Sequence, residues 1–164
     1  MRHIADDGGK YKNGGDVVGL RETLQQALVN ANDHRLACHE ALQECDSELV
    51  QAKANLEKAH SCKLGADEIN QTAVRDQQAL AAYCAKFEDP KARDALHPAI
   101  NRLGVEQRVA LRNSIKADEA FRRCQSTFTE IENRRTGAQQ RLDRATERWE
   151  QIRKQVEQIS VLDA

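Results

Sequence analysis

A heptad pattern running from Ile100 to Ile159 constrains this chain more than any other feature. One set of positions recurs every seven residues: Ile100, Gln107, Ser114, Phe121, Phe128, Arg135, Leu142, Trp149 and Val156. The set three residues later reads Leu103, Ala110, Ala117, Cys124, Ile131, Ala138, Ala145, Ile152 and Ile159. This spacing places both sets on one side of an α-helix, along a narrow seam that needs a partner helix over its whole length.

A second heptad series lies in the first half of the chain. Its larger residues are Leu28, Arg35, Leu42, Leu49 and Leu56, and its mostly small ones are Leu24, Ala31, Cys38, Cys45, Ala52 and Ala59. Small seam residues let two helix axes approach closely, which suits an antiparallel pair. The pattern shifts near residues 63–66, after which we expect the seam to consist of Ala66, Ile69, Ala73, Leu80 and Phe87, with Tyr83 or Cys84 between the last two.

The shift near residue 65 has two interpretations. Gly65 could end one helix and Asp67 could cap another, or a stutter could interrupt one continuous helix. We favour a continuous helix, because a break would leave the long later helix half uncovered.

Only residues 88–98 clearly interrupt the two series. Pro90 and Pro98 each disfavour helix at the preceding residue, with room for one helical turn at 91–96 between them. The sequence therefore predicts an all-α fold, a long two-helix antiparallel coiled-coil hairpin with a disordered N-terminal tail. The predicted parts are a flexible, glycine-rich tail at 1–15, a first arm at 16–87, a hairpin tip at 88–98 and a second arm at 99–164.

The start of the second arm carries further apolar residues off the seam: Val105, Val109, Leu111 and Ile115. They could form an exposed patch for a partner. We expect them instead to pack locally, against a small element such as the turn at 91–96.

Composition and charge argue against several classes of function. The halves differ in charge, with 12 basic and 16 acidic side chains in residues 1–98 and 13 basic and 10 acidic ones in residues 99–164. An acidic helix lying against a basic one explains this difference, and no dense Lys/Arg block with interleaved aromatics indicates nucleic-acid binding. No apolar run is long enough for a membrane span or a secretion signal. The five cysteines then favour reduced thiols in a cytosol.

Some residues have the spacing of metal ligands or the chemistry of catalytic groups. His34 and Cys38 have a chelating i, i+4 spacing, and His39, Cys45, His60 and Cys62 lie nearby in sequence. Cys38 and Cys45 nevertheless fall on the seam, where cysteine acts as a small hydrophobe, and no close Cys pair is present. The carboxylates fall mostly on solvated faces without a pocket. We expect no metal, no cofactor and no enzymatic activity.

Trp149 is the only tryptophan and lies on the seam. We expect it to anchor the packing between the two arms. The alternative is an anchor for a bound partner, since tryptophan is over-represented among interface hot spots.

This pattern, together with the Trp- and Arg-containing last arm RLDRATERWEQIRKQVEQI (141–159), resembles the SctO/FliJ stalk proteins of type III secretion and flagellar export systems. The resemblance covers about residues 17–162. It implies a virulence-related protein-transport function, as a cytoplasmic stalk between a hexameric secretion ATPase and an export gate. Such a stalk is similar in fold to the central shaft of rotary ATPases.

The resemblance also implies partners and sites. The residues expected near the ATPase are Arg141, Arg144, Arg148, Trp149 and Arg153, and those expected near the gate are Asp89, Pro90, Lys91 and Arg93. Chaperones are further expected partners, and the protein would reach the inner membrane only through its partners. A stalk should be a monomeric hairpin. The alternatives are a coiled-coil scaffold or dimerisation spacer, which should self-associate, and a secretion chaperone.

Overall fold

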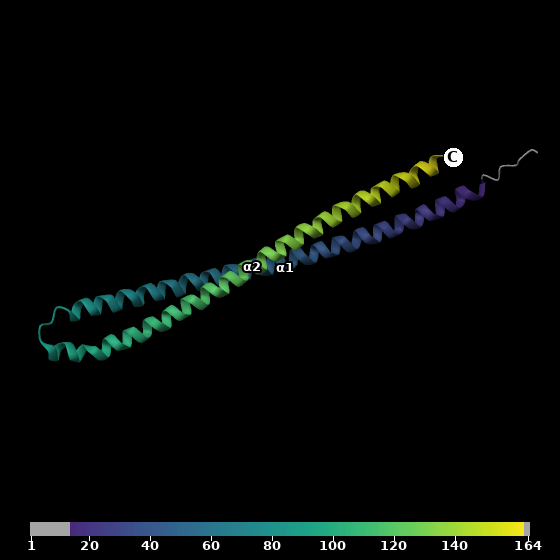
Figure 1. Ribbon diagram of the computed structural model, residues 1–164. Helices are drawn as coiled ribbons and strands as arrows, with labels where there is room; N and C mark the ends of the chain where they lie inside the picture. Colours follow the sequence, from purple (N-terminus) through teal and green to yellow (C-terminus); the bar gives the residue numbers. More distant parts are fainter. Residues whose placement is uncertain (1–13, 163–164) are drawn as a thin grey trace, which may run out of the picture. The chain divides into compact units, whose positions relative to one another are not determined.

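The computed structural model describes residues 14–162, and their side chains from residue 19 to residue 159. It consists of two helices, α1 (Gly14–Cys84) and α2 (Pro90–Leu162), joined by residues 85–89 (Figure 1). No strand occurs within residues 14–162. The prediction of an all-α helical hairpin is therefore confirmed. Nearly all of the predicted flexible tail, residues 1–15, lies outside the described residues.

The chain divides into two compact units, and each contains a stretch of both helices. We call them the terminal unit (Met1–Glu44 with Arg135–Ala164) and the tip unit (Cys45–Arg134). In the tip unit, contacts between the helices join Glu48 to Arg134, Lys63 to Asp118 and Asp67 to Ser114. The partner number falls as the α1 number rises, so the two helices are antiparallel in this unit.

The predicted seam of α2 is confirmed along its length. Every one of its positions from Ile100 to Ile159 is buried or half-buried. The small residues lie deepest, with Ala138 only 1% and Ala145 only 4% exposed. Side chains this small allow the helix backbones to approach, which explains why alanine recurs on the seam.

Helix α1 continues through Gly65, as expected, and the predicted seam residues Ala66, Ala73, Leu80 and Phe87 are half-buried, but the heptad does not shift. The original heptad continues with half-buried Lys63, Asn70 and Gln77 and with buried Cys84. Ile69, expected on the seam, is 64% exposed. Because Lys63, Asn70 and Gln77 are polar, the sequence does not reveal that the heptad spacing continues unchanged.

The bend between the helices is shorter than the sequence predicts. Helix α1 ends at Cys84 and α2 already begins at Pro90. The Asp89 carboxylate accepts a hydrogen bond of 3.0 Å from the Lys91 backbone N–H, which caps the start of α2. Proline suits the first position of a helix, because its missing N–H would have no partner there. Pro98 lies inside α2 and does not end it.

Candidate protein-interaction surfaces

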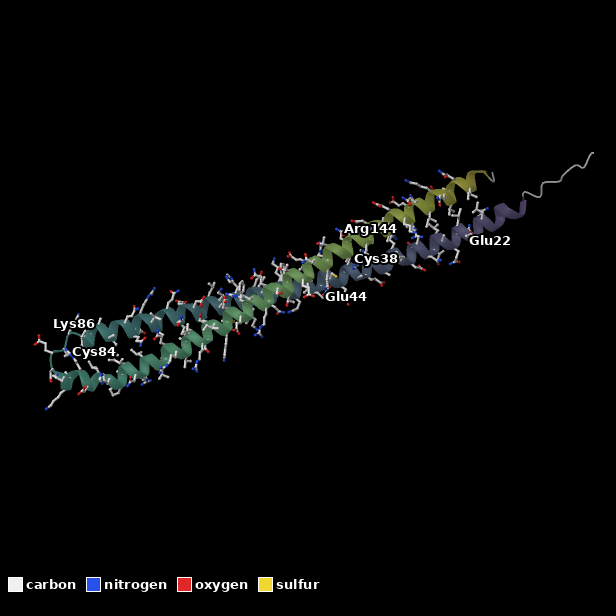
Figure 2. The ribbon with its side chains drawn as sticks, in the orientation of Figure 1. Glu22, Cys38, Glu44, Cys84, Lys86 and Arg144 are labelled. Carbon is white, nitrogen blue, oxygen red and sulfur yellow. The ribbon has the colours of Figure 1, made fainter. Side chains whose placement is uncertain are left out.

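A row of three arginines follows one side of α2 in the terminal unit. Arg141, Arg144 and Arg148 are spaced i, i+3 and i+7, which places them on one face of the helix. All three are exposed, and none has an ion-pair partner within the described residues. Arg144 is labelled on α2 in Figure 2. Three predicted partner-binding residues therefore form one continuous basic row.

Trp149 lies on the seam beside this row. Its ring is half-buried and contacts two cations, the Arg35 guanidinium of α1 at 4.9 Å and the Arg153 guanidinium at 5.1 Å from the ring centroid. Arg153 also pairs with Glu157 at 3.5 Å. Such cation–π contacts favour one position of an aromatic ring. Trp149 and Arg153 thus have contacts within the unit, which agrees with a packing role for the tryptophan.

An acidic row on the opposite side of α2 was not anticipated from the sequence. Asp143, Glu147 and Glu150 line an open groove together with Arg35 and His39 of α1. None of the three carboxylates has an ion pair among the described residues. Their spacing of i, i+4 and i+7 is a detectable signal for a shared face. In this unit, α2 therefore separates its charges into a basic row and an acidic row.

The predicted contact residues of the tip have structural roles. Asp89 and Pro90 form the start of α2, and the Arg93 side chain donates a hydrogen bond of 2.5 Å to the Phe87 carbonyl. Only Lys91 has an exposed side chain with no contact of its own within residues 14–162. Figure 2 labels Cys84 and Lys86 where α1 meets this connection. These contacts stabilise the bend. They give Asp89, Pro90 and Arg93 a structural role that requires no partner protein.

The seam of the tip unit contains a cross-helix polar cluster. The Lys63 ammonium lies 2.5 Å from the Asp118 carboxylate and 5.3 Å from the centroid of the Phe121 ring. The hydrogen bond from Lys63 lowers the pKa of Asp118 below its ordinary value of 3.8, against the opposing effect of burial, and Arg122 adds to the lowering. A lysine is tolerated on the seam because its stem packs while its charged end reaches a carboxylate.

The expected local packing of the extra apolar stripe is wrong. Val105, Val109, Leu111 and Ile115 are 51%, 50%, 47% and 51% exposed. The turn that was expected to cover them is instead the first part of α2. The stripe is an exposed apolar surface on the tip unit.

The candidate metal ligands His34 and Cys38 lie close together, but no third ligand joins them within residues 14–162. His34 Nε2 lies 3.8 Å from Cys38 Sγ, as the i, i+4 spacing predicts. No group of three or more His, Cys, Asp or Glu side chains gathers around a common point within residues 14–162. All five cysteines have free thiols. Two donors do not complete the coordination of a structural zinc ion.

Comparisons with known proteins do not assign the chain to a family. No protein-family model matches the chain, and neither a curated protein nor a solved structure matches it significantly. In residues 14–162, neither helix includes a stretch apolar enough to cross a lipid bilayer.

Proposed function

We propose that this chain is a non-enzymatic protein that acts by binding other proteins, as a stalk between the ATPase and the export gate of a type III secretion system. One observation supports this proposal most. In the terminal unit, the seam is closed by small residues, whereas α2 carries uncompensated basic and acidic rows on its outer sides. A helix pair that packs its seam residues against each other and leaves ordered charge on its outer sides is suited to charge-guided binding of another protein.

The basic row is the proposed contact with the ATPase. Arg141, Arg144 and Arg148 project from one helix face and have no counter-charge among the described residues. Arginine is enriched at interfaces because its planar guanidinium makes several directed hydrogen bonds. The ATPase surface that binds this row is therefore expected to be acidic.

Stimulation of ATP hydrolysis tests the proposal. The purified full chain is titrated into the type III secretion ATPase of the same organism, and the rate of ATP hydrolysis is measured. We expect the rate to increase at saturation. The variant Arg141→Gln/Arg144→Gln/Arg148→Gln should need about tenfold more protein for half-stimulation, as three exposed charge contacts would suggest.

The matched control is Lys53→Gln/Lys58→Gln/Arg75→Gln, which removes three exposed cations from α1 in the tip unit. This variant should stimulate as the wild type does. If the wild type neither binds nor stimulates the ATPase, the stalk proposal is wrong. Stable self-association in light scattering would then favour the dimerisation spacer.

A further inference from the structure

The back of α2 in the tip unit combines apolar and basic side chains in a regular array. Arg108, Arg112 and Lys116 follow one another at i+4 spacing and form a central basic row. Two apolar pairs, each also spaced i, i+4, flank this row: Val105 with Val109 on one side, and Leu111 with Ile115 on the other. We call these seven residues the back surface.

The charges of the back surface have no counter-charge inside the protein. None of Arg108, Arg112 and Lys116 has an ion pair within residues 14–162. The nearest acids in sequence already have partners, because Glu106 pairs with Arg102 at 3.2 Å and Asp118 pairs with Lys63 at 2.5 Å. The seam residues of the same segment, among them Ala110 and Ser114, face α1. The back surface is therefore not part of the hairpin's own packing.

We propose that the back surface binds an acidic amphipathic helix of another protein. A complementary partner helix has a central row of carboxylates at i, i+4 and i+8, which face the three cations. It also has apolar residues on both flanks of that row. An amphipathic helix supplies this pattern on one face. The inference does not rest on the stalk role and adds a second, separate contact.

A second copy of this chain fits the back surface poorly. A two-fold symmetric dimer places the same patch of both subunits against each other. Here that arrangement would bring Arg108, Arg112 and Lys116 of one copy close to the same three cations of the other. Like charges brought together at an interface repel one another and weaken the association. The charge of the surface thus selects an acidic partner.

Fluorescence anisotropy with a designed peptide tests the proposal. The probe is a labelled, acetylated helical peptide that has three glutamates at i, i+4 and i+8 and leucines on both flanks. A second probe carries lysines in place of the glutamates. Full-length protein should bind the acidic probe, bind the basic probe at least about tenfold more weakly, and lose affinity as salt rises.

Two variants identify the surface. Arg108→Gln/Arg112→Gln/Lys116→Gln removes the basic row, and Leu111→Gln/Ile115→Gln removes one apolar pair. Each should weaken binding of the acidic probe about tenfold, since it deletes several contacts at once. Glutamine is a good helix former and these positions are exposed, so both variants should keep their helical circular dichroism. The control Lys53→Gln/Lys58→Gln/Arg75→Gln should bind as the wild type does.

Three results would overturn the proposal. The first is an acidic probe that fails to bind, or that binds no better than the basic probe. The second is unchanged affinity in both back-surface variants. The third is a dimer in light scattering that Leu111→Gln/Ile115→Gln dissociates, because the occupant would then be a second copy of this chain.

Discussion

The Ser114 hydroxyl of α2 donates a hydrogen bond of 2.5 Å to the Asp67 carboxylate of α1, across 47 positions of sequence. The bond lies one helical turn from the Lys63–Asp118 ion pair. Polar contacts at coiled-coil seams select one register, because a shifted pairing would leave these groups without partners. We therefore expect these two contacts to determine how the helices of the tip unit align.

A double-mutant cycle measures the hydrogen bond. Asp67→Ala and Ser114→Ala are made singly and together, and the free energy of unfolding is determined in urea. We expect a coupling of about 1 kcal/mol, the usual net value of an intramolecular hydrogen bond. Strictly additive effects would mean that the two side chains do not interact in solution.

Acid should weaken the tip unit through Asp118. Its pKa is lower in the folded chain than its ordinary value of 3.8, chiefly because of the Lys63 hydrogen bond. A lowered folded-state pKa contributes stability above the unfolded pKa, and this contribution is lost as the pH falls through the folded pKa. The melting temperature of the wild type should therefore fall further between pH 5 and pH 2 than that of Asp118→Asn. Equal falls in both proteins would show that the ion pair is not formed.

Asn70 is a seam residue with an unsatisfied group. Its Oδ1 is buried and has no hydrogen-bond partner among the described residues. Removing such a group is stabilising, and leucine also adds apolar burial, so Asn70→Leu should raise the free energy of unfolding by about 1 kcal/mol. The exposed neighbour Gln71→Leu is the control and should have little effect. A less stable Asn70→Leu protein would show that the amide is satisfied in solution.

Close packing in the terminal unit can be tested at Ala138, which is 1% exposed. A leucine there cannot fit between the helices without moving them, so Ala138→Leu should cost about 1–3 kcal/mol of stability. The control Ala37→Leu is at an exposed position of α1 in the same unit and should be nearly neutral. Thermal unfolding, monitored by circular dichroism, distinguishes the two variants. A tolerated leucine at 138 would contradict the close approach of the helices.

The fold was predictable where seam residues are apolar. The α2 seam alternates large residues such as Phe121 with small ones such as Ala138, and its phase is visible without a structure. In the later seam of α1, apolar residues such as Ala73 and Leu80 are predictable, whereas the seam positions of Lys63, Asn70 and Gln77 are not, because these residues look like surface residues. The place of Lys63 on the seam depends on Asp118, which is distant in sequence, and no local pattern reveals that contact.

The candidate surfaces were predicted less completely. The arginines of the basic row were named from a resemblance, and their i, i+3, i+7 spacing already placed them together. The apolar residues of the back surface stand out in the sequence, but Pro98 suggests a separate element beside them and so favours local packing. Since Pro98 lies within α2, no such element exists in the described chain.

Zero-length cross-linking can test whether α1 and α2 of one chain pair with each other. A carbodiimide joins an ammonium to a carboxylate in contact with it, as Lys63 is with Asp118. An equal mixture of unlabelled and heavy-nitrogen-labelled protein is treated, digested and analysed by mass spectrometry, with Asp118→Asn as the control. If the helices pair within one chain, we expect a Lys63–Asp118 cross-link whose two peptides always carry the same label. Cross-linked peptides that mix the two labels would show that the helices pair between chains, and would contradict pairing within one chain.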